Sequence, residues 1–189
     1  MLVRKPVPIT DIRNVQSECR AIDDDMRWLI ALISDTGMRL AEGAGLLKRD
    51  FMGLDTDLPF VRVTKHSWRN LKTASSERKI PLVGEALWAA KRIVETGNSS
   101  DFGFPRYNRA SPTAANSASA ALNEWLKHYV PDGCTMHSFR HSMRDRLRAV
   151  QCPSDITDQI GGWTTDGVGQ GYGSGYPMRV LREWLERAI

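Results

Sequence analysis

The fold and the candidate site depend most on the stretch His137-Ser-Phe-Arg-His141, which continues through Gly161-Gly-Trp163 to Tyr172. Apolar residues at helical spacing begin within its first motif and predict a helix, with the histidine and the arginine one turn apart on another face. The run 167–175 alternates glycine with other residues, so we expect a flexible loop that carries the tyrosine. The stretch therefore predicts a helix and a loop that together present two cationic side chains and a phenol.

A second informative stretch is Thr36-Gly-Met-Arg39-Leu-Ala-Glu42. Arg39 and Glu42 are three residues apart, so a short helix here would place both side chains on one face. The pair has two interpretations at this stage. It is a surface ion pair worth less than about 1 kcal/mol, or Glu42 fixes the guanidinium so that Arg39 can hold a phosphate with two hydrogen bonds.

A β-hairpin is predicted between residues 60 and 82. Residues 60–64 alternate apolar and polar side chains, as a half-buried strand does, and 78–82 form the return strand. Pro81 cannot donate a ladder hydrogen bond, which places this strand at a sheet edge or places Pro81 near the end of the strand. The hairpin carries Lys65, Arg69, Lys72, Arg78 and Lys79. Such cations either discourage pairing with other sheets or contact DNA.

Helices account for most of the remaining chain. Helical spacing of apolar residues predicts helices over 8–21, 24–34, 84–96, 113–129 and 178–189, and a short one begins near Pro153. Thr10 or Asp11 is expected to cap the first helix. The last is strongly amphipathic and must bury its apolar stripe. The fold class is therefore α+β and mainly helical, with a small antiparallel sheet at one edge, and we expect residues 1–189 to form a single domain.

Composition narrows the functional classes. The chain has 189 residues, 41% of them hydrophobic, and a net charge of +4, which favours a polyanionic partner. No apolar run reaches the roughly 20 residues of a membrane span, and no secretory signal is recognisable. Three cysteines without close spacing are typical of reduced thiols in a cytoplasmic protein.

These residue types suit attack on a phosphodiester. Two arginines can stabilise the negative charge that gathers on the non-bridging oxygens. Acid and base groups must move protons to the leaving oxygen and from the nucleophile. A tyrosine nucleophile conserves the bond energy in a phosphotyrosyl ester. These roles are filled by Arg39, Lys72, His137, Arg140 and Tyr172, and no Asp/Glu cluster suggests a two-metal nuclease.

Four motifs in order resemble those of the tyrosine recombinase (phage integrase) family. The segment 36–42 matches its T-G-x-R-x-x-E signature, and Lys72 to Leu82 resembles its lysine-bearing hairpin. The segment 137–141 matches its H-x-x-R-H box. Gly162-Trp163 and Tyr172, nine residues apart, match the interval to its nucleophile. The resemblance covers most of the chain and implies the family's catalytic fold.

The resemblance also implies roles for six catalytic residues: Arg39, Lys72, His137, Arg140, Trp163 and Tyr172. The two arginines would bind the scissile phosphate, and the lysine would protonate the leaving 5′-oxygen. The histidine would assist proton transfer as the base for the tyrosine, and the tryptophan would support the phosphate pocket. The tyrosine would form a 3′-phosphotyrosine. Tyr176 is a rival nucleophile, and Lys65 and Lys79 are rivals of the lysine.

By resemblance, the chain is a metal-independent, cofactor-free enzyme of site-specific DNA recombination, typical of phage integration and mobile elements. Its expected partner is duplex DNA in the cytoplasm, with a homotetramer formed on DNA through the helix at 178–189. The family's N-terminal core-binding domain is not expected within these residues. Three alternatives remain: a non-catalytic DNA-binding protein of recombinase descent, a metalloprotein using His137 and His141, and a nucleotide-binding module using the glycine-rich run.

Overall fold

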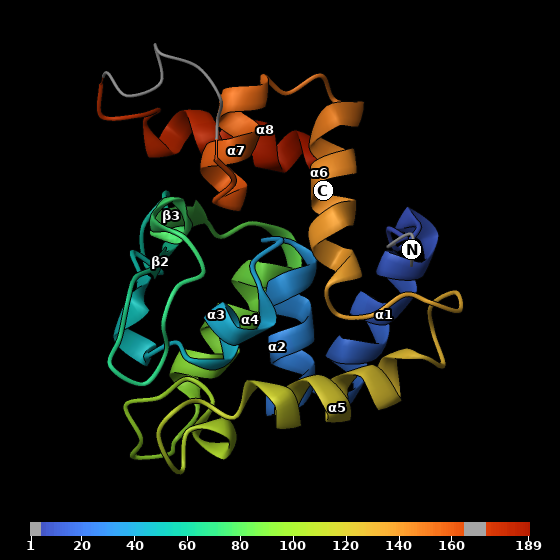
Figure 1. Ribbon diagram of the computed structural model, residues 1–189, viewed down its shortest axis with the longest axis vertical. Helices are drawn as coiled ribbons and strands as arrows, with labels where there is room; N and C mark the ends of the chain where they lie inside the picture. The colour runs from blue at the N-terminus through green and yellow to red at the C-terminus, as the bar shows by residue number, and fades with distance from the viewer. Residues whose placement is uncertain (1–4, 165–172) are drawn as a thin grey trace.

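The computed structural model describes residues 5–164 and 173–189 (Figure 1). Strands β1 (Phe51–Met52), β2 (Phe60–Val63) and β3 (Arg78–Pro81) lie among helices and short 3-10 turns. The helices are α1 (Ile9–Ile22), α2 (Asp25–Ser34), α3 (Leu40–Ala44), α4 (Gly84–Glu95), α5 (Ala115–Leu126), α6 (Ser138–Ala149), α7 (Ser154–Gly161) and α8 (Met178–Ala188). The 3-10 turns are η1 (Lys48–Asp50), η2 (Ala74–Ser76) and η3 (Pro105–Tyr107). The predicted mainly helical α+β class is confirmed.

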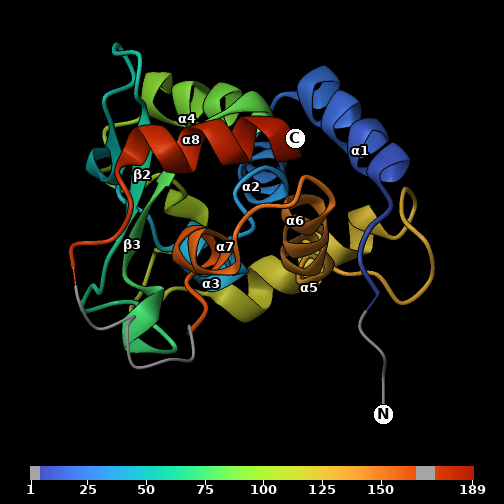
Figure 2. The same ribbon diagram turned by 90° about the horizontal axis from the view of Figure 1, so that it is seen from above.

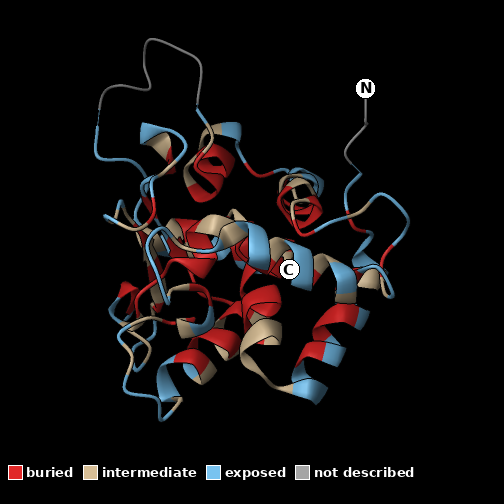
Figure 3. Ribbon diagram, turned by 60° about the horizontal axis from the view of Figure 1, so that its bottom comes forward, coloured by how far each residue is buried: buried red, intermediate tan, exposed pale blue. Residues whose placement is uncertain are grey.

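Helix α2 is the centre of the core. Its residues from Trp28 to Ser34 are all buried, as expected for a helix that is apolar on every side. Helices α1, α3, α4 and α6 all contact it, and Figure 3 shows that the buried residues gather in the interior while the exposed ones lie on the outside. The Asp24 carboxylate caps α2 by accepting a hydrogen bond from the backbone nitrogen of Arg27 at 3.0 Å.

The predicted hairpin forms two strands of a three-stranded antiparallel sheet with the order β1-β2-β3. Val61 pairs with Ile80, and both are fully buried. Pro81 lies in an edge strand and pairs with Phe60, as predicted. Strand β1 was not predicted, because its two residues are too few to show a periodic pattern.

The first helix begins within one residue of the predicted start, but its predicted N-cap is wrong. Pro8 is its N-cap, and no side chain caps it, so Thr10 and Asp11 lie inside the first turn. The tertiary structure sets this boundary: the backbone nitrogen of Val7 donates to Oγ of Ser142 at 2.7 Å and fixes the chain just before the helix.

Helix α8 packs against α6 and β3 of the same chain (Figure 2). Leu181, Leu185 and Ala188 form its buried stripe. Arg146 of α6 donates to the carbonyl oxygen of Ala188 at 3.0 Å, which holds the end of the helix. The expected amphipathic helix is therefore confirmed and finds its burial partner within the chain, whereas a tetramer formed through this helix stays a prediction.

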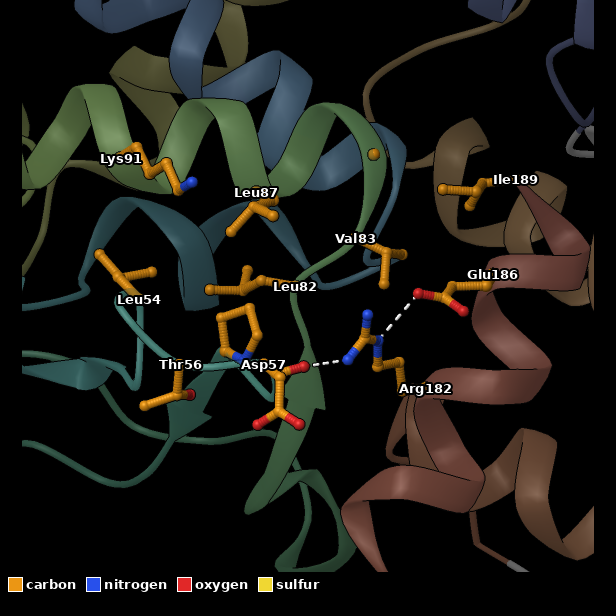
Figure 4. Close-up of a pocket in the computed structure, with 12 residues that line it drawn as sticks. Leu54, Thr56, Asp57, Leu82, Val83, Leu87, Lys91, Arg182, Glu186 and Ile189 are labelled. Carbon is orange, nitrogen blue, oxygen red and sulfur yellow. Dashed lines mark hydrogen bonds and ion pairs between the residues drawn. The ribbon is translucent and has the colours of Figure 1, made fainter.

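A pocket of about 340 Å³ lies between α8, α4 and the turn that connects β1 to β2 (Figure 4). Arg182 crosses it, donating to the carbonyl of Asp57 and pairing with Glu186 at 2.8 Å. None of the six predicted site residues lines this pocket.

Two further features were expected from the composition, namely unpaired cysteines and the lack of a membrane-spanning helix. Cys19, Cys134 and Cys152 are free thiols. Within residues 5–164 and 173–189, no helix is long and apolar enough to cross a membrane.

Candidate active site

The turn between α2 and α3 brings Arg39 and Arg140 together. Gly37 has a φ of +68°, and a Cβ at this position would lie 2.8 Å from Cβ of Met143 on α6. Only glycine meets both conditions without strain. Its carbonyl oxygen accepts a hydrogen bond from Nη1 of Arg140 at 3.0 Å. The Thr-Gly pair of the first motif therefore docks the segment that carries Arg39 onto the helix that carries Arg140.

Glu42 is buried, and its carboxylate orients Arg39. The Arg39 residue is the N-cap of α3, where its backbone nitrogen donates to Oε2 of Glu42 at 2.9 Å and its Nη1 donates to Oε1 at 3.0 Å. The same Nη1 donates to Oγ of Ser76 at 3.0 Å. Because Glu42 is only 3% exposed, the surface-ion-pair interpretation is wrong, and the geometry matches the interpretation in which Glu42 fixes the guanidinium.

Two of the hairpin cations are internal. Arg78 is buried and holds Glu42 through Nη2 to Oε2 at 3.0 Å. Arg69 is also buried and donates to the backbone carbonyls of Glu42 and Thr64. Arg78 thus supplies the buried Glu42 carboxylate with a cationic partner, whereas Arg69 is used to bind backbone carbonyl oxygens.

The charges act on Glu42 in opposite directions. Burial alone raises the pKa of its carboxyl group, but the guanidinium groups of Arg78 and Arg39 outweigh burial and lower the pKa below its ordinary value. Glu42 is therefore a carboxylate at neutral pH and serves as the counter-ion of the surrounding arginines.

Arg140 is buried among cations. Burial, followed by the charges of Arg39 and Arg78, lowers the pKa of its guanidinium to about 9. Its Nη2 is a buried donor without an acceptor among the residues described. The carbon Cζ of Arg140 lies 4.3 Å from the ring centroid of Trp163, and that of Arg144 lies 5.0 Å away. Trp163 thus contacts two guanidinium groups and supports Arg140 by a cation–π interaction.

His137 lies one turn before Arg140, at the N-cap position of α6. Its ring meets that of His141 edge-to-face, with centroids 5.1 Å apart. Within the described ranges, no group of three or more His, Cys, Asp or Glu side chains is arranged to hold a metal ion.

Lys72 lies in the connection between β2 and β3, beside the site, and its side chain is exposed. The turn that follows Lys72, η2, contacts both Arg39 and the segment after α7. Ser76 accepts from Arg39, and Ser75 lies within hydrogen-bond reach of Thr164, with 3.4 Å between the two hydroxyl oxygens. The segment of Lys72 is thus placed next to Arg39 and to the turn after α7, although its ammonium group makes no ion pair within the described residues.

The structure describes Tyr176 but not Tyr172. Tyr172 lies outside the described residues, so its position stays a prediction. The hydroxyl of Tyr176 donates to Oδ2 of Asp155 at 2.5 Å, and its backbone nitrogen donates to Oε1 of Gln159 at 2.9 Å. Asp155 is at the start of α7, about 10 Å along the helix axis from its end near Trp163. The hydroxyl of Tyr176 is therefore engaged by Asp155 in this structure.

Sequence reasoning missed the specific roles of three residues, namely Ser76, Arg78 and Arg144. The signal for Arg78 was available, because residues 78 and 80 share one face of a strand and Ile80 is an inward-facing residue. The contacts of Ser76 and Arg144 had no such signal, since they join segments that are distant in sequence.

Comparisons with known proteins agree with this arrangement. The sequence matches the phage integrase family over residues 10–175. The chain belongs to the phage integrase family. A comparison with curated proteins finds no match.

Solved structures of tyrosine recombinases share the fold of this phage integrase family member. The Tn1549 transposon integrase in complex with circular intermediate DNA is 19% identical, with a TM-score of 0.63 over 100% of this chain and 68% of that chain. XerA recombinase is 16% identical, with a TM-score of 0.61 over 96% of this chain and 58% of that one. XerH recombinase bound to palindromic difH substrate is 14% identical, with a TM-score of 0.61 over 98% of this chain and 50% of that one.

Proposed function

We propose that this chain cleaves and rejoins strands of duplex DNA in site-specific recombination, through a 3′-phosphotyrosine intermediate. The main support is the buried cluster around Arg140. Three guanidinium groups, those of Arg39, Arg78 and Arg140, surround one carboxylate, that of Glu42, so two positive charges remain uncompensated. A buried donor and an excess of buried positive charge both favour binding of an anion.

A phosphodiester suits this cluster. Arg39 is oriented by Glu42 and partly exposed, and Nη2 of Arg140 has no acceptor among the described residues. Together they would bind the non-bridging oxygens and stabilise the charge that develops on them as phosphorus becomes five-coordinate. Trp163 would keep the guanidinium of Arg140 in place through its ring contact.

The chemical steps follow from the remaining residues. The phenolic oxygen of Tyr172 attacks phosphorus, and His137 accepts the phenolic proton. The bond between phosphorus and the 5′-oxygen breaks, and Lys72 donates a proton to that oxygen. The 3′-phosphotyrosyl ester retains the bond energy, so attack by a 5′-hydroxyl reverses the sequence and reseals DNA without a nucleotide or metal cofactor.

The partner we propose is duplex DNA, which is present in the solved complexes of the Tn1549 integrase and XerH. Recombination exchanges strands between two duplexes, so we further propose a homotetramer on DNA that uses α8. Because α8 covers its own chain in this structure, assembly would require its stripe of Leu181 and Leu185 to change partner. Sedimentation with and without DNA measures this assembly.

Covalent trapping on a nicked duplex, whose cleaved fragment diffuses away, tests the proposed reaction. The wild type should form a protein–DNA adduct, and Tyr172→Phe should form none, because it lacks the attacking oxygen. Tyr176→Phe is the matched control and should trap normally, since Tyr176 is bonded to Asp155. The reverse pattern would move the nucleophile to Tyr176. Absence of an adduct with the wild type would favour the non-catalytic DNA-binding alternative.

A further inference from the structure

The guanidinium of Arg78 joins three segments of the site. Its Nη2 and Nη1 bind the two carboxylate oxygens of Glu42 at 3.0 and 3.3 Å. Its Nη1 also donates to the carbonyl oxygen of Ser76 at 2.5 Å, in the turn after Lys72. Its Nε donates to the carbonyl oxygen of Ile160 at 2.9 Å, in the last turn of α7. One side chain therefore contacts the α3 segment, the lysine-bearing connection and the helix that precedes Trp163.

The contact with α7 bears on the position of Trp163. Carbonyls in the last turn of a helix lack intrahelical donors, and a cation there is favourable. Gly162 follows with a φ of +67°, and a Cβ on it would lie 2.7 Å from Nη1 of Arg78. The backbone that leads into Trp163 thus turns directly over the guanidinium of Arg78.

The charges of Glu42 and Arg39 explain why Arg78 is needed to keep the group positively charged. Glu42 paired with Arg39 alone would be neutral. With Arg78 the trio has two positive charges and one negative charge, which leaves one positive charge. The Arg39 side chain is 21% exposed and that of Arg78 is 4% exposed. Each nitrogen of the Arg78 guanidinium also has a protein acceptor, so within this trio an incoming phosphate meets the surplus charge at Arg39.

We propose that Arg78 is a positioning residue, which shares Glu42 with Arg39 and binds the Ser76 and Ile160 carbonyls, and so sets the charge and orientation that Arg39 offers to a phosphate. This inference rests on the proposed function. Arg78 does not touch DNA in this arrangement, because its three guanidinium nitrogens are all bonded to protein oxygens. Without it, Glu42 would neutralise Arg39, and the turn that holds Trp163 would lose its support.

Single-turnover cleavage of the nicked duplex by Arg78→Met tests the proposal. We expect the cleavage rate to fall about 100-fold, because small misplacement of catalytic groups costs this much. The dissociation constant for DNA should stay within about threefold, because other phosphate contacts persist.

A double variant separates positioning from general destabilisation. Arg78→Met combined with Glu42→Gln removes the carboxylate that neutralises Arg39 in the single variant, and should recover about tenfold of the lost rate, since the charge of Arg39 is no longer cancelled. A merely structural Arg78 would give a double variant no faster than the single one.

Arg146→Met is the matched control. Arg146 is buried like Arg78, each being 8% exposed when the whole residue is counted, and it also joins distant segments, through Ser34, Asp35 and Ala188. Its variant should melt at a lower temperature but cleave at the wild-type rate wherever circular dichroism shows it folded. If Arg78→Met does not fold, Arg78→Lys replaces it, because one ammonium group cannot hold two carboxylate oxygens and two carbonyls.

The outcomes are distinct. A wild type that never forms the adduct overturns the proposed function and this inference with it. A wild type that cleaves beside an Arg78 variant that is folded and equally active overturns the inference alone. An active wild type, a slow single variant and a faster double variant support both.

Discussion

Arg140 has a buried guanidinium nitrogen, Nη2, without an acceptor in the described part of the chain. Burial and the neighbouring arginines also lower the pKa of the side chain. Both features oppose a charged group in the free protein, and both are relieved when an anion binds. Residues of this kind are retained for binding at some cost in stability.

Sulfate should therefore stabilise the protein through Arg140. An anion at 100 times its dissociation constant stabilises the folded state by about 2.7 kcal/mol, and about 1 kcal/mol raises the melting temperature of a chain this size by about 2–4 °C. We expect a rise of about 5 °C or more in the wild type and a much smaller one in Arg140→Gln, measured by thermal melting against sodium chloride of equal ionic strength. Arg148→Gln, exposed on the same helix, is the control. Equal shifts in all three proteins would contradict an anion site at Arg140.

Glu42 makes the stability depend on acid pH. Burial raises the pKa of Glu42, but Arg78 and Arg39 bring it below the ordinary value of 4.5. The unfolded chain therefore takes up the proton at a higher pH than the folded one. The stability that Glu42 contributes is fully present above pH 4.5 and is lost as the pH falls through the lower folded-state pKa.

Urea unfolding from pH 6 to pH 3 measures this dependence. The wild type should lose about 1.4 kcal/mol for each unit by which the folded pKa lies below the unfolded one. Glu42→Gln should show a flatter profile and a lower stability at pH 6, because the arginines lose their counter-ion. Glu183→Gln, an exposed residue of α8, should retain the wild-type slope. A Glu42→Gln profile as steep as that of the wild type would assign the acid dependence to other carboxyl groups.

At the scale of elements, α8 closes the core of its own chain. Leu181 and Leu185 are buried against α6 and β3, and Arg146 connects the last turn of α8 to the end of α2. The C-terminal helix is thus part of the fold, and it touches the strand that carries Arg78.

Leu185→Ala should lower the free energy of unfolding by about 2–5 kcal/mol, as removal of a fully buried leucine does. The exposed neighbour Glu183→Ala should change it by less than about 0.5 kcal/mol. Urea unfolding of the isolated chain, at a concentration where it is monomeric, measures both. If Leu185→Ala altered only the association state, α8 would be an intermolecular element in solution.

At the scale of the whole molecule, the net charge of +4 and the proposed site imply DNA binding dominated by phosphate contacts. With about six such contacts, affinity should fall roughly 1000-fold between 50 and 200 mM salt, and removal of one contact, by Arg39→Ala, should reduce the logarithmic slope by about 1. Fluorescence anisotropy with a labelled duplex measures the slope. Binding that does not respond to salt would exclude an interface of this kind.

Local patterns predicted much of this protein. Helical spacing identified α2, α4, α6 and α8, and alternation identified the β2–β3 hairpin, because these patterns report which side of an element faces apolar surroundings. The motifs around Arg39 and Arg140 also named the segments that meet at Gly37. Strand β1 and the N-cap at Pro8 were not predicted. A two-residue strand has no period, and the start of α1 depends on a contact with Ser142.

The sequence by itself determined the helical elements, their apolar faces and the residue types available for phosphate chemistry, because these follow from side-chain spacing along the chain. Only the tertiary structure decided that Glu42 is an internal counter-ion, that Arg69 and Arg78 are buried while Lys72 is exposed, and that α8 packs on its own chain. The physical reason is that burial and charge pairing depend on segments tens of residues apart, as between Arg78 and Ile160. No local pattern along the chain specifies such contacts.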